Sequence, residues 1–135
     1  MFDSLATSTP SSITLGDRVF TQPMRFPSML IPPLPGLYAI LVKDNGLFGS
    51  LMRPVYIGES EDLKKRLTVA HEKCDDWKRE AAGRELYYAL HTPVGMLNDQ
   101  QRRDAEHELI DRLQPPCNIK GSFWDEVGSI FSKQF

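Results

Sequence analysis

Glu106 is the acidic residue whose position suggests chemistry, because it falls in the middle of the apolar side of a predicted helix. Each helical residue advances by about 100°, which places Ile110 about 40° and Leu113 about 20° from Glu106. The other acids of this segment project to the opposite side, namely Asp104, Glu108 and Asp111. A carboxylate on the buried side needs a partner, because burying it alone is costly. That partner is either Arg102, one turn earlier on the same side, or a metal ion. One carboxylate with open positions suits Mg²⁺, which keeps water and phosphate ligands.

Three further polar side chains are predicted to point inward. Tyr38 and Tyr56 lie on two β-favouring segments that should pair, so their rings can meet on one face. Arg66 lies at the edge of the apolar stripe of the helix that follows. Buried tyrosines are most often core residues, yet each buried hydroxyl needs a hydrogen-bond partner. Together with Glu106, these side chains make a polar cluster that a purely structural domain would rarely build.

Three β-favouring segments are predicted to form strands, at residues 37–42, 54–58 and 86–91. The turn signal Asp44–Gly46 closes the first of them. The first two strands are therefore expected to pair as a hairpin with a long loop between them.

Two segments have apolar residues at helical spacing. The first runs from a predicted N-cap at Ser60 to about Ala81, and the second from residue 98 or 99 to Leu113. Lys64 and Lys65 point outward from the first helix and form, with Arg66, the densest local basic patch. The order of elements predicts an α+β fold with a small three-stranded antiparallel or mixed sheet flanked by helices.

The chain divides into three predicted parts. Residues 1–35 are rich in Pro, Ser and Thr and are expected to form an extended arm, with regular structure beginning at Gly36. Residues 36–120 form the domain. Residues 121–135 are predicted to be an amphipathic tail that docks on the domain, with binding of a protein partner through the arm or the tail as the alternative.

Composition narrows the class of protein. The 135 residues suit one domain, and 16 basic against 18 acidic side chains give a net charge of −2, so bulk charge does not imply nucleic-acid binding. Cys74 and Cys117 lack the spacing of a zinc module and suit a reducing compartment. No apolar segment is long enough to span a bilayer. We therefore expect a cytoplasmic protein without a membrane partner.

Four segments in order carry a family resemblance. They are Gly36-Leu37-Tyr38, Tyr56-Ile57-Gly58-x-Ser60-x-Asp62-Leu63-x-x-Arg66-Leu67, Glu106-x-x-Leu109-Ile110 and Pro115-x-x-Asn118. This pattern resembles the GIY-YIG nuclease family over residues 36–120, and four ordered segments are far more specific than any one of them. The resemblance implies a metal-dependent endonuclease that hydrolyses phosphodiesters of nucleic acid, with DNA as the expected substrate.

The resemblance also implies a role for each matching residue. Glu106 would hold a single Mg²⁺ or Mn²⁺ ion, and Arg66 would neutralise charge on the phosphate. Tyr38 would act as general base or position the attacking water, with Tyr56 hydrogen-bonded nearby. Asn118 would fix part of the site by hydrogen bonding, or would simply cap the chain reversal after the prolines.

Substrate contacts are expected from the end of the second strand and the start of the first helix. Gly58 would allow close backbone approach at the strand end. Lys64 and Lys65 would contribute the local positive charge that a phosphate backbone requires.

Two features depart from the family pattern. The family places a His or Tyr four residues after the arginine, where this chain has Ala70; His71 follows and would lie about 140° from Arg66 on a regular helix. His71 is expected to reach the site only if that helix is distorted or ends early. The segment between the tyrosines is also long and includes Gly46–Gly49, either as a substrate contact or as a surface excursion.

The competing interpretation is a catalytically inactive module of the same fold that binds nucleic acid or a partner protein. The acidic pI of about 5.9 and the displaced His71 favour this interpretation, whereas the complete set of other motif residues opposes it.

Overall fold

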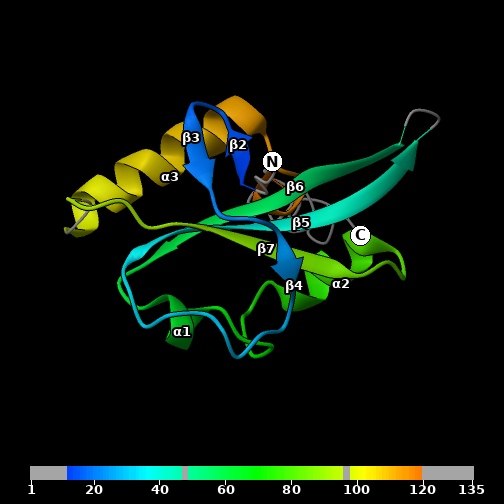
Figure 1. The fold of residues 1–135 in the computed structure, drawn as a ribbon, viewed down its shortest axis with the longest axis horizontal. Helices are drawn as coiled ribbons and strands as arrows, with labels where there is room; N and C mark the ends of the chain where they lie inside the picture. Colours follow the sequence, from blue (N-terminus) through cyan, green and yellow to red (C-terminus); the bar gives the residue numbers. More distant parts are fainter. Residues whose placement is uncertain (1–11, 47–48, 96–97, 120–135) are drawn as a thin grey trace, which may run out of the picture.

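The centre of the molecule is a four-stranded antiparallel sheet (Figure 1). The computed structural model describes residues 12–46, 49–95 and 98–119. The order across the sheet is β4 (Met24–Arg25), β7 (Leu86–His91), β5 (Gly36–Gly46) and β6 (Gly49–Ser60). The α+β class is confirmed, and the three predicted strands lie within β5, β6 and β7. The predicted count of three was too low, because β4 adds a fourth strand.

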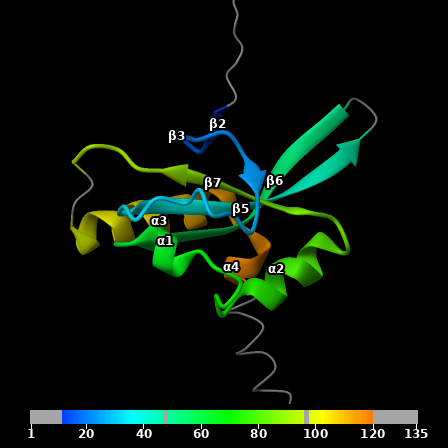
Figure 2. The ribbon, with the colours of Figure 1, turned by 60° about the horizontal axis from the view of Figure 1, so that its bottom comes forward.

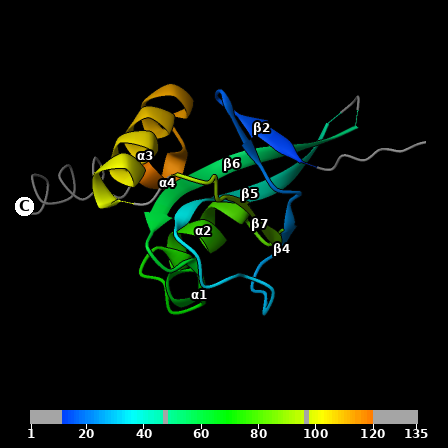
Figure 3. The ribbon, with the colours of Figure 1, turned by 60° about the vertical axis from the view of Figure 1, so that its left-hand side comes forward.

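Each face of the sheet is covered, as Figure 3 shows. One face packs against α1 (Leu63–Arg66), α2 (Cys74–Ala81) and α4 (Pro116–Ile119). The other packs against α3 (Asp99–Leu113) and the hairpin of β2 (Ile13–Leu15) and β3 (Arg18–Phe20). Because successive strand residues point to opposite faces, β5 sends Tyr38, Ile40 and Val42 to the first core and Leu37, Ala39 and Leu41 to the second. All six are buried, which explains the continuous apolar run in the sequence.

The expectation that regular structure begins at Gly36 was wrong. The segment before it contains β2, β3 and β4, and it buries four apolar side chains, those of Leu15, Phe20, Phe26 and Ile31. The amide of Phe26 also donates to the carbonyl of Leu86 at 2.9 Å. Strands of two or three residues leave no detectable period in the sequence, and prolines between them obscure what remains.

The long loop expected between β5 and β6 is absent from the described part of the hairpin. The two strands stay paired as far as Gly46 opposite Gly49, with only residues 47 and 48 outside the description. Asp44 and Asn45 therefore belong to a strand rather than to a turn. The additional residues lengthen the hairpin, which projects beyond the rest of the sheet in Figure 2.

The single helix predicted from Ser60 to Ala81 is divided in two. Asp62, rather than Ser60, caps α1 by accepting the amide proton of Lys65 at 3.2 Å. The chain leaves the helix at Leu67 and passes through turns to α2. Thr68 and Val69 are β-branched and disfavour a continued helix, and the Thr68 hydroxyl accepts a hydrogen bond from the amide of Ala70.

The second predicted helix is confirmed as α3. Asn98 and Gln101 form a capping box at its start, and Gln114 adopts a left-handed conformation at its end. Within the described ranges, no helix is long and apolar enough to cross a membrane. The predicted tail, residues 121–135, lies outside the described residues.

Candidate active site

Two tyrosines meet on the face of the sheet that α1 and α2 cover. The ring centroids of Tyr38 on β5 and Tyr56 on β6 are 6.1 Å apart, and both side chains are buried. Gly58 lies directly across from Tyr38 in the sheet. A Cβ atom at position 58 would come within 2.3 Å of the Tyr38 ring. The absence of a side chain at Gly58 therefore makes room for the Tyr38 ring. The sequence had suggested a different role, in which the substrate approaches the backbone at Gly58.

His71 reaches this pair because the predicted helix is broken. Its Nε2 lies 2.7 Å from the hydroxyl of Tyr38. The centroids of the His71 and Trp77 rings are 4.5 Å apart, and the two rings are tilted relative to each other. The Nδ1 atom of His71 accepts the backbone N–H of Lys73 at 3.0 Å. A backbone N–H can only donate, so a neutral His71 carries its proton on Nε2 and donates it to Tyr38. The sequence predicted that His71 would reach the site only if the helix were distorted or ended early, and α1 does end early, at Arg66.

The charge state of His71 follows from its surroundings. Burial, together with the neighbouring charge of Arg66, lowers the pKa of His71 to about 4. His71 is thus neutral near neutral pH, which agrees with its hydrogen bonds.

Arg66 ends α1 beside the tyrosines and forms a two-pronged ion pair with Glu72. Its Nη1 and Nη2 donate to the two carboxylate oxygens at 2.7 and 2.6 Å. These hydrogen bonds raise the pKa of Arg66 and lower that of Glu72 to about 2, so both are charged. Glu72 was not predicted from the sequence. On a continuous helix, residues 66 and 72 would lie on different sides, and they meet only because the helix is broken.

Glu106 lies at the edge of the buried side of α3, rather than in its middle as predicted. The buried residues of this helix are Arg102, Ala105 and Leu109, and the Glu106 side chain is 19% exposed. Burial raises its pKa, and the nearby carboxylate of Glu59 raises it further. The charge of Glu106 in turn raises the pKa of Tyr56 and of Tyr38, so the carboxylate lies close enough to act on both phenols.

Arg102, the side chain that could have neutralised Glu106, is engaged with other carboxylates. Its Nε lies 3.0 Å from Glu59, and its Nη2 is paired with Asp99. The arginine is buried, so its charge is compensated within the helix–sheet interface. Glu106 itself accepts a hydrogen bond from the Glu59 backbone, and its Oε1 lies 3.8 Å from Nε2 of His107.

Burial dominates the acidity of both phenols. It raises the pKa of Tyr56 to about 12 and that of Tyr38 still higher, although the charge of Arg66 acts in the opposite direction. With the protein's own groups alone, both hydroxyls stay protonated near neutral pH. This environment suits hydrogen bonding to water better than proton abstraction.

Asn118 fixes the strand that carries Tyr56 and Gly58. Its Oδ1 accepts the amide proton of Ile57 at 2.8 Å, and its Nδ2 donates to the Ile57 carbonyl at 2.9 Å. Because β6 is an edge strand, Ile57 would otherwise present both groups without a strand partner. The Asn118 side chain thus takes the place of a neighbouring strand at this one residue.

Two predicted substrate contacts lie at the surface. Lys64 and Lys65 are exposed on α1, one turn or less from Arg66. Over the described ranges, no cluster of three or more His, Cys, Asp or Glu side chains could hold a metal ion.

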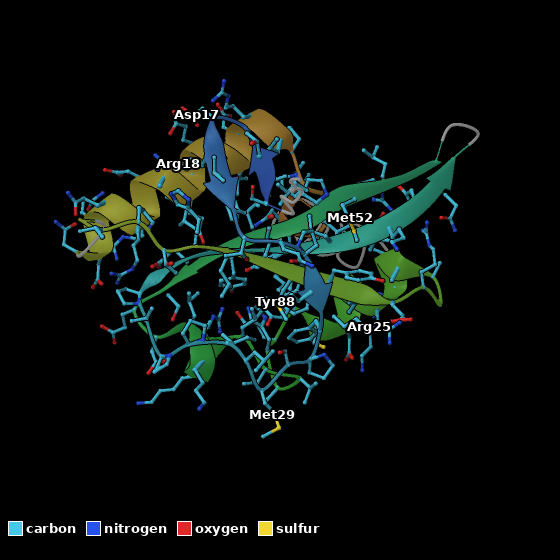
Figure 4. All side chains as sticks on the ribbon, viewed as in Figure 1. Asp17, Arg18, Arg25, Met29, Met52 and Tyr88 are labelled. Atoms are coloured by element: carbon cyan, nitrogen blue, oxygen red, sulfur yellow. The ribbon has the colours of Figure 1, made fainter. Side chains whose placement is uncertain are left out.

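A pocket among the described residues lies away from the tyrosine pair. An open depression of about 600 Å³ lies between β3 and α3 and is lined by Arg18, Asp104 and Glu108, among others. Figure 4 shows Arg18 between these two elements. None of the motif residues lines this pocket, and we place the chemistry at the tyrosine pair because the polar groups converge there.

Two solved structures of one nuclease domain are similar to this chain. No protein-family model matches the sequence, and no curated protein matches it. Among solved structures, the magnesium-bound GIY-YIG N-terminal endonuclease domain of UvrC from Thermotoga maritima is 26% identical, with 66% of this chain and 88% of that chain covered at a TM-score of 0.42. A tyrosine-to-phenylalanine point mutant of the same domain, bound to its catalytic divalent cation, is 27% identical, with 66% and 87% covered at a TM-score of 0.43.

The chain is similar to GIY-YIG endonuclease domains.

Proposed function

We propose that this protein is a divalent-metal-dependent endonuclease that hydrolyses phosphodiester bonds of nucleic acid, with DNA as the expected substrate. The observation that supports this most is the convergence on one point of a neutral phenol, a guanidinium and a carboxylate. Tyr38 is held by His71 at 2.7 Å, Arg66 lies beside it, and Glu106 is near enough to act electrostatically on both phenols. These are the groups that water positioning, phosphate binding and metal binding require.

Glu106 fits a magnesium or manganese ion by its donor chemistry. Its half-buried oxygens lie where burial and the Glu59 carboxylate disfavour negative charge, so a cation would relieve that cost. With a single carboxylate, the other positions would remain for water and phosphate, which Mg²⁺ retains readily. When bound, the ion would supply charge stabilisation at the leaving oxygen.

The chain's own residues divide the remaining work. Arg66 binds the phosphate through its planar fork of donors. His71 donates to the Tyr38 oxygen and so leaves the Tyr38 hydroxyl proton available to hold the attacking water. Tyr56 completes the wall of the site. Lys64 and Lys65 contact flanking phosphates from the exposed side of α1.

Plasmid nicking in the presence of Mg²⁺ tests this function. We expect Glu106→Gln and Arg66→Ala each to lower the nicking rate by about a hundredfold or more, because each removes a charge that acts on the reacting phosphate. Asp111→Asn, which neutralises an exposed acid on the same helix, is the matched control and should nick like the parent. Far-UV circular dichroism confirms that the variants fold. If both site variants keep parental activity, the proposal fails.

A module that retains the fold without catalysis is the second candidate. The raised pKa of both phenols favours it, since neither hydroxyl is a ready base. Calorimetry with Mn²⁺ separates the two: an enzyme gives a binding heat that Glu106→Gln abolishes, and an inactive module gives none. A protein partner bound through residues 1–35 or 121–135 belongs to this candidate.

A cytoplasmic location is part of the proposal. Cys74 and Cys117 are buried thiols that form no disulfide, as is usual in a reducing compartment.

A further inference from the structure

The ion pair between Arg66 and Glu72 has the form of a phosphate-binding site that already holds an anion. Two nearly equal hydrogen bonds, 2.7 and 2.6 Å long, join the guanidinium fork to both carboxylate oxygens. Arginine binds phosphate with the same two-pronged geometry. Glu72 therefore occupies the donors that an incoming phosphate would use.

This carboxylate is accessible from solvent. The Arg66 side chain is 37% exposed and that of Glu72 is 60% exposed, so the pair lies at the mouth of the site. An exposed ion pair is weak, because water screens both charges. A phosphodiester that other contacts also hold can therefore displace the carboxylate at small cost.

The fold holds the backbone of Glu72 in place. The preceding residue, His71, is buried against Tyr38, and the following residue, Lys73, donates its amide to the His71 ring. The side chain of Glu72, by contrast, is 60% exposed and borders solvent. Its carboxylate can release Arg66 and swing into solvent without disturbing the tyrosine pair.

We propose that Glu72 is a positioning residue that holds Arg66 in its phosphate-binding orientation and is displaced by the substrate phosphate. This inference rests on the proposed nuclease function. Before substrate binds, the pair keeps the guanidinium extended beside Tyr38 and neutralises its charge. Weakly bound anions then compete poorly for Arg66, whereas a phosphodiester also held by other contacts of the site displaces the carboxylate.

Steady-state nicking and metal-free binding of a fluorescent oligonucleotide, in EDTA, test this role together. Glu72→Gln retains one acceptor for Arg66 but removes the competing charge. We expect KM and the oligonucleotide Kd to fall about two- to fivefold with kcat within twofold, as loss of a weak competing ion pair implies. Glu72→Ala should give the same gain in affinity but a lower kcat, because Arg66 loses its orientation.

Glu61→Gln is the matched control, since it changes net charge equally at an exposed acid four residues before Lys65. If Glu72→Gln and Glu61→Gln change KM and Kd equally, only general electrostatics is at work and the inference is overturned. The gain in affinity must also disappear in an Arg66→Ala background. A different result would separate the two proposals. If Glu72→Gln binds the oligonucleotide more tightly than the parent, but the parent never nicks DNA, the nuclease proposal is overturned and the displacement of Glu72 stands.

Discussion

At the scale of single residues, the Tyr38 hydroxyl is the centre of the candidate site. It accepts a hydrogen bond from a histidine that burial keeps neutral, and its ring rests against a glycine that leaves room for it. The charges of Arg66 and Glu106 act on the pKa of the same hydroxyl in opposite directions. A change at any of these positions therefore alters the environment of one phenol.

The buried histidine predicts a specific loss of stability in acid. Its pKa is about 4 in the folded protein and near 6.5 when unfolded, so the unfolded chain takes up the proton first as pH falls. Stability contributed by neutral His71 is complete above pH 6.5 and is lost between pH 6.5 and 4. We expect a loss of about 1–2 kcal/mol between pH 7 and pH 5, at about 1.4 kcal/mol per unit.

His71→Asn checks this expectation, because its amide oxygen can still accept the Lys73 N–H but does not titrate. Urea unfolding at pH 7 and pH 5 should show a smaller pH dependence for the variant than for the parent. Equal dependence in both proteins would contradict the assignment of a depressed pKa to His71.

At the scale of elements, two irregular pieces assemble the site. The break between α1 and α2 turns His71 and Glu72 toward the end of α1. The short helix α4 places Asn118 beside the edge strand β6, where its amide pairs with both backbone groups of Ile57. Regular helices and strands supply the frame, whereas these irregular segments supply the contacts.

The same substitution at two asparagines should have opposite outcomes. Asn118→Asp keeps the acceptor for the Ile57 amide but places a carboxylate oxygen against the Ile57 carbonyl, and we expect a loss of about 1–3 kcal/mol. Asn98→Asp needs only an acceptor at the start of α3 and should be neutral or slightly stabilising. Thermal unfolding measures both. Similar effects at the two positions would show that the donor side of Asn118 is unimportant.

At the scale of the whole molecule, residues 12–35 complete both cores. Phe20 enters the core beneath α3, and Phe26 packs edge-on against Trp77 in the other, with centroids 5.6 Å apart. Strand β4 pairs with β7 at the edge of the sheet opposite β6. This segment belongs to the folded unit, although its sequence resembles a linker.

Two neighbouring substitutions in β3 test that conclusion. Phe20 is 1% exposed, and Phe20→Ala should lower the free energy of unfolding by about 3–5 kcal/mol. Val19 is 59% exposed, and Val19→Ala should change it by less than about 0.5 kcal/mol. Urea unfolding gives both values. An arm that merely lies on the domain would make the two variants equally stable.

Residues with a local signal were predicted correctly from the sequence. The apolar runs of β5, β6 and β7 and the capped, periodic helix α3 are encoded in neighbouring residues. The meeting of Tyr38 with Tyr56 followed from strand pairing alone. The inward bias of Glu106 followed from helical geometry, although its place at the edge of the buried side did not.

By itself, the sequence determined the class of fold, the central hairpin and the helix that carries Glu106, since hydrophobic period and capping act over a few residues. Tertiary structure alone decided that β4 joins the sheet, that His71 forms a hydrogen bond with Tyr38 and that Glu72 forms an ion pair with Arg66. These contacts depend on where the chain breaks a helix and which distant surfaces then fit together. Packing energies between segments remote in the chain decide such events, and no local pattern records them.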